Sequence, residues 1–160
     1  IVITHGGFVG INHYQAAKAA VAAIPAVKKG GYLLLFSNNT DKDPIGSTSY
    51  KSVLYLLKAL KAKRFNKLIQ SPDWIPLHDQ WQVQMWSKVF KEVPLDNFIY
   101  YSPQLSEDDF CFIPGKNGNC FIPKEKRYNY SCDNIPLFVQ NCLIQLLGCE
   151  YKKNKDRGGK

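Results

Sequence analysis

Apolar and polar residues are arranged along the first third of the chain in segments whose lengths predict a strand, a helix and a second strand. Residues 1–4 form an apolar run of strand length, and residues 11–27 form an alanine-rich segment of helical length. Asn12 is a suitable cap for that helix, and the basic, glycine-containing residues 28–31 are typical of a helix end. Residues 32–36 form a second apolar run, as in a buried parallel strand. We therefore expect a βαβ unit.

Apolar residues at helical spacing predict further helices. Residues 48–64 carry such a pattern, and Asp79 with Gln82 forms a potential capping box at the start of the next helix. The apolar face of that helix comprises Trp81, Met85, Trp86, Val89 and Val93. Residues 98–101 read as a third strand, and residues 134–147 as a last helix.

These elements predict an α/β fold: a Rossmann-like three-layer sandwich, with a mostly parallel sheet and helices on both of its faces. We expect one domain over residues 1–150 and a basic polar tail over residues 151–160. The sequence Cys-Phe-Ile-Pro occurs twice, at residues 111–114 and 120–123, around a turn rich in glycine and asparagine. This repeat predicts a hairpin, preceded by a short helical turn over residues 106–110.

Charge and cysteine content narrow the classes of partner. The chain has 21 basic and 13 acidic residues, a formal net charge of +8, which suits a small carboxylate, a phosphate or an acidic surface. The basic residues of the segment 51–67 are expected to form a solvated helix face, since no nucleic-acid-binding motif accompanies them. No apolar run reaches the ~18 residues of a membrane span, and no signal peptide is recognisable, so we expect a cytoplasmic protein. Five cysteines without paired spacing predict free thiols and no metal site.

The glycine-rich loop between the first strand and the first helix occupies a position where α/β proteins often bind ligands. A dinucleotide-binding Gly-x-Gly-x-x-Gly loop would need glycine where His5 stands, and the nearest acidic residue after the second strand is Asp41, a few residues on. An esterase oxyanion loop would need a Gly-x-Ser-x-Gly elbow, which the chain lacks. Three residues of this region are candidates for a loop near a substrate or an anion: Gly6, Gly7 and Asn12.

Gln15 and Lys18 are three residues apart, so on a helix they share one face near its N-terminal end. A lysine donates hydrogen bonds to a carboxylate, and a glutamine both donates to and accepts from a neighbouring hydroxyl. Together the two side chains would suit a small 2-hydroxy acid. The alternative is that both are surface residues of an amphipathic helix.

Three sequence motifs follow one another along the chain: Gly6-Gly7-Phe8, the segment NHYQAAK at residues 12–18, and VKKGG at residues 27–31. A fourth, Asp79-Gln80-Trp81, opens the helix after residue 79. In this order they resemble the C-terminal domain of nickel-dependent lactate racemases, a family of 2-hydroxy-acid racemases and epimerases. The resemblance covers about residues 1–105, and relative to that family residues 111–133 look like an insertion.

In that family a separate N-terminal domain holds a nickel pincer nucleotide cofactor, and the C-terminal domain supplies a glutamine and a lysine that hold the substrate. The resemblance therefore implies that Gln15 and Lys18 bind a small 2-hydroxy acid, with Tyr14 as a supporting residue, and that this chain holds no catalytic residue and no metal ligand. Since the chain begins at Ile1 without an initiator methionine, we expect a fragment that is inactive without its N-terminal domain.

Two contrasting arrangements follow from these hypotheses. The racemase hypothesis predicts an open cleft with Gln15 and Lys18 at its rim, and an exposed apolar patch where the N-terminal domain docks. The alternative is a standalone nucleotide- or anion-binding module, in which a phosphate would lie on the N–H groups of residues 7–12.

Overall fold

The computed structural model describes residues 1–121, and the fold presented here is that of the compact unit Ile1–Asn117. Its centre is an all-parallel sheet with the strand order β1-β2-β3-β4. The strands are β1 (Val2–His5), β2 (Leu33–Phe36), β3 (Phe98–Tyr101) and β4 (Lys116–Asn117). The carboxyl ends of β1, β2 and β3 meet in register, since His5 pairs with Phe36 and Phe36 pairs with Tyr101.

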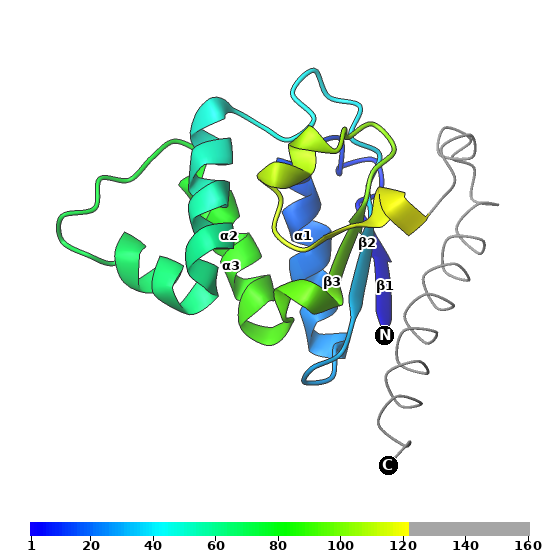
Figure 1. Cartoon of the computed structure of the whole chain (residues 1–160), viewed down its shortest axis with the longest axis horizontal. Helices are drawn as coiled ribbons and strands as arrows, with labels where there is room; N and C mark the ends of the chain where they lie inside the picture. Colours follow the sequence, from blue (N-terminus) through cyan, green and yellow to red (C-terminus); the bar gives the residue numbers. More distant parts are fainter. Residues whose placement is uncertain (122–160) are drawn as a thin grey trace, which may run out of the picture. The chain divides into compact units, whose positions relative to one another are not determined.

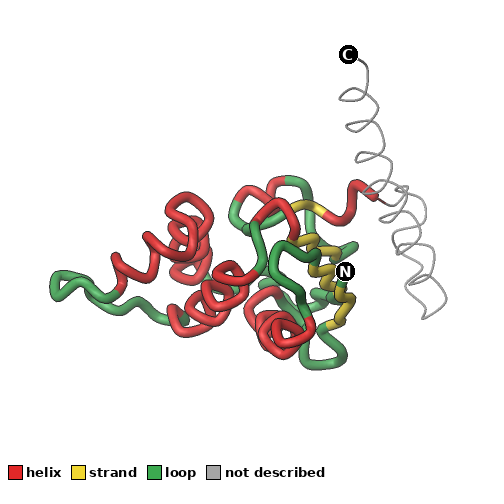
Figure 2. The backbone as a smooth tube through the Cα atoms, turned by 90° about the horizontal axis from the view of Figure 1, so that it is seen from below, coloured by secondary structure: helices red, strands yellow, loops and turns green. Residues whose placement is uncertain are grey.

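Three α-helices pack on one face of this sheet (Figures 1 and 2). They are α1 (His13–Ala23), α2 (Thr48–Ile69) and α3 (Gln80–Glu92). Strand residues Leu33, Leu35, Phe98 and Tyr100 share one hydrophobic core with residues of all three helices. The strand order explains this placement. When successive strands are added in one direction by right-handed crossovers, each connection passes over the same face.

The predicted α/β fold class with a parallel sheet is confirmed. On the opposite face of the sheet, the remaining side chains of β2 and β3 are also buried: Leu34, Phe36, Ile99 and Tyr101. Both β2 and β3 are thus uninterrupted apolar strands, as expected for parallel strands covered on two sides.

The first strand and the first helix differ in detail from the prediction. β1 is an edge strand rather than a buried one, and its Ile3 is 43% exposed. Asn12 caps α1 as predicted, because its Oδ1 accepts the Gln15 N–H at 2.8 Å. The helix ends earlier than expected and continues as a 3₁₀ turn at Ile24–Ala26, where the ring of Pro25 removes a helical donor.

The second helix is longer than predicted and is broken. It reaches Ile69 instead of residue 64, but Lys61 has φ 61° and ψ 163°, which is far from helical. The break separates a first segment, which begins at the Ser47 cap, from a shorter second segment over residues 62–69.

The predicted hairpin is not formed by the described residues. Cys111 ends a 3₁₀ turn (Asp108–Cys111), which realises the predicted helical turn at a slightly later position. The residues between the two repeats, which were expected to form the hairpin turn, include the strand β4 instead. This strand pairs in parallel with β3. Gly115 enters β4 with φ 100°, and a Cβ there would lie 2.5 Å from the Phe98 ring, so this approach requires glycine. The second repeat begins in another 3₁₀ turn, Gly118–Phe121.

Several predictions fall beyond these residues. The last helix at 134–147, the tail at 151–160, the remainder of the insertion, and Cys132, Cys142 and Cys149 lie outside the described residues. The single domain over residues 1–150 stays a prediction. Cys111 and Cys120 are free and exposed. None of the helices within residues 1–121 is long and apolar enough to cross a membrane.

Candidate functional site

The loop after β1 is held tightly against the loop after β2. The Gly6 N–H donates to the Phe36 carbonyl at 2.7 Å, and the Gly10 N–H donates back to the Gly6 carbonyl at 2.9 Å. The Ser37 hydroxyl donates to the Gly10 carbonyl at 2.6 Å. A Cβ on Gly10 would lie 2.7 Å from the Cα of Gly6, so the two backbones touch. Gly7, with φ 57°, is the turn residue of this loop.

A buried asparagine ties these loops to the third strand. The Asn39 amide nitrogen donates to the Gly10 carbonyl at 3.1 Å, and its Oδ1 accepts from the Tyr100 hydroxyl at 2.7 Å. Burial raises the pKa of Tyr100 well above its usual value, so its hydroxyl remains a donor at neutral pH. Gly10, Asn39 and Tyr100 thus join the segments that follow or belong to three different strands.

The N–H groups at the start of α1 are used within the protein. The His13 N–H donates to the Pro44 carbonyl at 2.8 Å, and the Tyr14 N–H donates to the Ile45 carbonyl at 3.1 Å. Since Asn12 accepts the Gln15 N–H, all of the first three helical residues have partners. A phosphate on this helix start would have to displace these bonds.

Asp41 has a structural role in the same region. Its carboxylate accepts the side-chain amide of Asn12 at 2.6 Å, and its own N–H donates to the Ile11 carbonyl at 2.9 Å. Asp41 therefore fixes the loop after β2 to the α1 cap, and its carboxylate is already bonded.

Gln15 and Lys18 share one side of α1, as their spacing predicts. Gln15 is half-buried, and its Oε1 is shielded from solvent without a hydrogen-bond partner among the described residues. Lys18, one turn later, is exposed. Tyr14 precedes them and packs edge-on against Tyr50 and Trp81, with ring centroids 5.5 and 5.6 Å apart.

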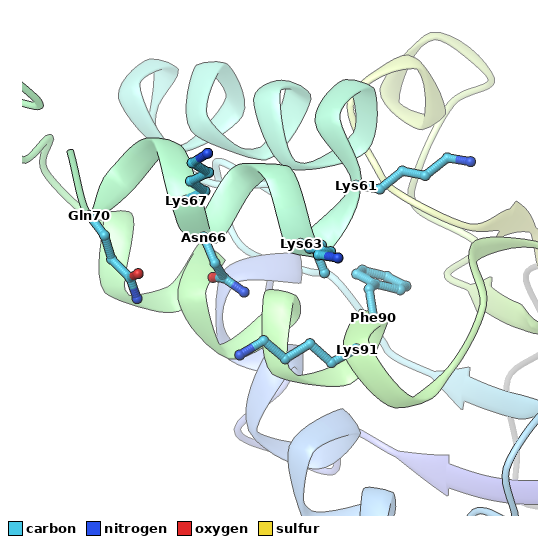
Figure 3. A pocket seen from close by; sticks show the side chains of 8 residues that line it. Lys61, Lys63, Asn66, Lys67, Gln70, Phe90 and Lys91 are labelled. Carbon is cyan, nitrogen blue, oxygen red and sulfur yellow. The ribbon is translucent and has the colours of Figure 1, made fainter.

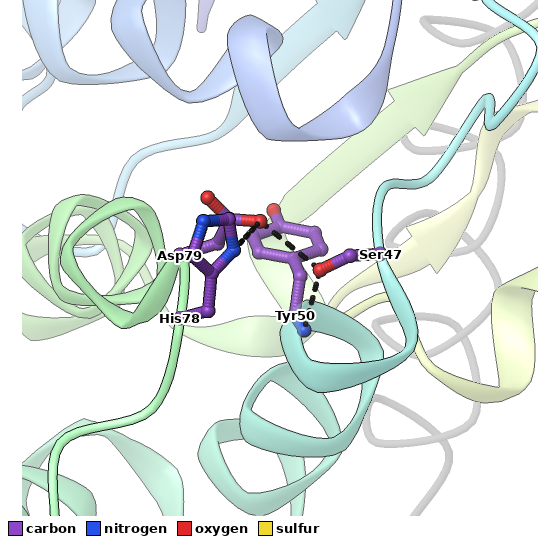
Figure 4. A network of polar contacts seen from close by, with 4 residues as sticks. All are labelled: Ser47, Tyr50, His78 and Asp79. Atoms are coloured by element: carbon purple, nitrogen blue, oxygen red, sulfur yellow. Dashed lines mark hydrogen bonds and ion pairs between the residues drawn. The ribbon is translucent and has the colours of Figure 1, made fainter.

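The start of α3 meets the start of α2 through polar contacts of Asp79 and Ser47 (Figure 4). The Asp79 carboxylate accepts from the Ser47 hydroxyl at 3.0 Å and lies 2.9 Å from His78 Nδ1. Ser47 in turn accepts the Tyr50 N–H at 3.2 Å. Burial, and then the nearby Asp79 charge, raise the pKa of Tyr14, so its phenol stays protonated.

The predicted capping box at Asp79 and Gln82 is wrong. Asp79 adopts a left-handed conformation with φ 64°, and its side chain makes no cap hydrogen bond. The carboxylate is turned toward Ser47 instead. Gln82 is buried near the Tyr14 phenol, and neither atom of its amide has a well-formed hydrogen bond within the described residues. Gln82 is thus a polar neighbour of the site that sequence spacing assigned to capping.

His13, within the NHYQAAK segment, belongs to the core. It is fully buried and stacked on Trp86, with ring centroids 4.5 Å apart. Its Nδ1 lies 2.8 Å from the Tyr50 hydroxyl, which also receives the Trp86 indole N–H at 2.8 Å. Since indole only donates, the Tyr50 oxygen accepts from Trp86 and its proton is free for His13 Nδ1; in that arrangement the imidazole proton is on Nε2. Burial lowers the pKa of His13 to about 3.

Exposed apolar side chains occur on two segments that flank Tyr14 in sequence or in space. The loop after β1 exposes Phe8 (93%), Val9 (42%) and Ile11 (43%), and the segment leading into α3 exposes Ile75 (79%), Leu77 (42%) and Trp81 (52%). Trp81 was expected on the buried face of α3, but it is 52% exposed and packs edge-on against Tyr14. Neither of the two grooves described below is lined by Gln15 or Lys18.

Comparison with protein-family models, with curated proteins and with solved structures finds no match. The resemblance to nickel-dependent lactate racemases therefore rests on the sequence motifs alone. Within residues 1–121 no three histidine, cysteine, aspartate or glutamate side chains gather where they would hold a metal ion. The resemblance assigns the nickel pincer nucleotide to a separate N-terminal domain.

Proposed function

We propose that the face of α1 bearing Tyr14, Gln15 and Lys18 binds a small 2-hydroxy acid, and that the chain is the substrate-clamping domain of a lactate racemase-like isomerase. The observation that carries this proposal is the Gln15 amide. Its Oε1 is buried and has no partner within residues 1–121, one helical turn from the exposed ammonium of Lys18. A buried acceptor without a partner is costly, and a ligand hydroxyl would satisfy it.

Each side chain has a definite part in this proposal. The Lys18 ammonium donates charge-assisted hydrogen bonds to the carboxylate of the ligand. Gln15 accepts from the hydroxyl on the adjacent carbon. Tyr14 remains protonated, because burial and Asp79 raise its pKa, so it is a donor and not a base. The proposal includes an N-terminal domain that holds the nickel cofactor. It also includes a cytoplasmic location, in which the cysteines remain free thiols.

The alternative of an anion held on the N–H groups of residues 7–12 has less support. The Gly10 N–H is bonded within the loop, and the N–H groups of His13, Tyr14 and Gln15 are bonded to the next loop or to the cap. In the first turn of α1 itself, side chains rather than these bonded N–H groups are therefore the groups available to a ligand.

Ligand-observed NMR with lactate and propionate, which lacks the hydroxyl, tests the clamp. Lys18→Gln should weaken both ligands about 10-fold, because each loses a charged hydrogen bond. Gln15→Ala should weaken lactate and leave propionate unchanged. Lys28→Gln, a matched loss of an exposed lysine, should change neither. Equal binding to natural protein, Gln15→Ala and Lys18→Gln would overturn the clamp.

Racemisation tests the enzymatic part separately. A longer form that carries an N-terminal domain, loaded with the nickel cofactor, should interconvert the two enantiomers of at least one 2-hydroxy acid. Gln15→Ala and Lys18→Ala should each remove most of that turnover. Unchanged turnover in both variants would contradict the assignment of these residues.

A further inference from the structure

A groove of about 690 Å³ lies between the second segment of α2 and the C-terminal end of α3 (Figure 3). Six side chains define what we call the basic groove: Lys61, Lys63, Asn66, Lys67, Phe90 and Lys91. Figure 3 shows Lys91 extending along the groove toward Asn66, with the Phe90 ring at the other end. Its volume is in the range of small-molecule sites.

The basic groove has four ammonium groups and no carboxylate of its own. No ion pair joins these lysines to an acidic side chain within residues 1–121. Glu92 lines the adjoining hollow of about 460 Å³, which shares Phe90 and Lys91 with the groove and to which Lys29 also contributes. Four like charges around one space repel one another, and an anion relieves that repulsion.

Asn66 adds a fixed neutral donor. Its Oδ1 accepts from the buried Ser87 hydroxyl at 2.7 Å, which sets the orientation of the amide. Its Nδ2 is shielded from solvent and has no partner among the described residues. The amide therefore has one unsatisfied donor within the wall of the groove, in an orientation that its bond to Ser87 of α3 holds.

The backbone at the edge of the groove is strained. Lys61 has φ 61° and ψ 163°, a region that is essentially restricted to glycine and costs about 1–3 kcal/mol for other residues. The break at Lys61 turns the chain so that residues 62–69 form a separate segment facing α3, and this segment supplies Lys63, Asn66 and Lys67. Strain of this kind is found where a site requires the geometry.

We propose that the basic groove binds a small phosphate ester with two or more phosphate groups. The lysines and Asn66 contact the phosphates, and the exposed edge of Phe90 contacts the organic part. This inference does not depend on the 2-hydroxy-acid clamp, because none of the groove residues belongs to it. It also departs from the sequence-based expectation of a solvated basic helix face.

Titration calorimetry at low ionic strength with inorganic tripolyphosphate and with ATP tests the proposal. Both should bind, and the triple variant Lys63→Gln, Lys67→Gln, Lys91→Gln should weaken them at least about 10-fold. A control triple, Lys42→Gln, Lys51→Gln, Lys116→Gln, has the same net charge and should weaken them less than about 3-fold. Asn66→Ala should weaken tripolyphosphate in the presence of all four lysines.

The two ligands also distinguish the sources of phosphate. Tighter binding of ATP than of tripolyphosphate, lost in Phe90→Leu, would support a nucleotide-like ester, and equal binding would support recognition of the phosphates alone. Equal weakening in both triple variants would show diffuse attraction and overturn the site. Binding of a single-stranded oligonucleotide without any binding of tripolyphosphate or ATP would overturn it as well.

Discussion

Among the described residues, Nδ1 is the ring nitrogen of His13 that has a hydrogen-bond partner, and the core surrounds an uncharged imidazole. The Tyr50 hydroxyl occupies Nδ1, and the Trp86 and Tyr100 rings pack on the imidazole. Protonation would place a charge in this apolar surrounding with no acidic neighbour to balance it, which is why burial lowers its pKa to about 3. Stability should therefore depend on pH through this residue.

The expected dependence has a definite sign. The unfolded chain binds a proton at His13 below its ordinary pKa of 6.5, whereas the folded protein binds it only near pH 3. The free energy of unfolding should thus fall as the pH drops through this range, by about 2 kcal/mol between pH 7 and pH 5. Urea unfolding of the natural protein and of His13→Asn at both pH values measures the contribution of His13 to this change in unfolding free energy. The variant should be less stable at pH 7 but should lose about 2 kcal/mol less on acidification. The same pH dependence in both proteins would contradict the burial of a neutral imidazole.

A substitution at Gly10 tests the close contact between the backbones of Gly6 and Gly10. A methyl group there would lie 2.7 Å from the Gly6 Cα and 2.8 Å from the Ser37 hydroxyl. Gly10→Ala should therefore cost about 2–3 kcal/mol of unfolding free energy. Gly7→Ala is a useful comparison, because a Cβ there would meet only the His5 ring, at an ordinary contact distance of 3.9 Å, and only its positive φ is unfavourable, at about 1–2 kcal/mol. Thermal unfolding should rank Gly10→Ala below Gly7→Ala, and the reverse order would be inconsistent with this packing.

At the scale of elements, α2 combines a strong helical pattern with a break at Lys61 that the residue types around it do not predict. Its apolar spacing predicted the helix correctly, and β2 and β3 were predictable as short apolar runs. The sequence has neither glycine nor proline at residue 61, so local propensity gives no signal for the break. The break depends instead on packing of the second segment against α3, which is a tertiary effect.

The strain at Lys61 leads to an unusual expected outcome for a helix. Lys61→Gly should stabilise the protein by about 1 kcal/mol, because glycine occupies this conformation without strain. Lys63→Gly, two residues on within the regular second segment, should destabilise it by about 1 kcal/mol. Opposite signs in chemical denaturation would confirm the break, and a loss of stability in both variants would argue for a continuous helix at residue 61.

The N-terminus of α3 illustrates a second limit of local patterns. Asp79 and Gln82 have capping-box spacing, yet Asp79 bonds to Ser47, which is 32 positions earlier in the chain. A local rule compares residues of one helix and does not include a competing partner from another helix. Asn12 does cap its helix as predicted. Its distant partner, Asp41, accepts from the amide nitrogen of Asn12, so Oδ1 remains available for the cap hydrogen bond.

At the scale of the whole molecule, the parallel order of β1, β2 and β3 brings three loops to one edge. That edge could be predicted from the βαβ pattern, as could the position of Gln15 and Lys18 on α1. The residues that hold the edge together could not, because Ser37 and Asn39 stand in a polar stretch with no motif around them. Their burial arises only when the loops meet.

The bond between Asn39 and Tyr100 allows this joining of distant segments to be measured. Asn39→Ala and Tyr100→Phe each remove one partner of a buried hydrogen bond and should each cost about 1–3 kcal/mol of unfolding free energy. The double variant should cost about 1 kcal/mol less than the sum, because the second substitution no longer leaves a partner unsatisfied.

A matched cycle provides the control for that coupling. Tyr32→Phe also removes a tyrosine hydroxyl, but Tyr32 precedes β2, at the opposite end of that strand from Asn39. Asn39→Ala and Tyr32→Phe should therefore combine additively in the same denaturant experiment. If the Tyr100 cycle is additive too, the carboxyl-edge loops are held by their separate packing. Coupling confined to Tyr100 would mean that one buried amide connects the loop after β1, the loop after β2 and the strand β3 into a single cooperative edge.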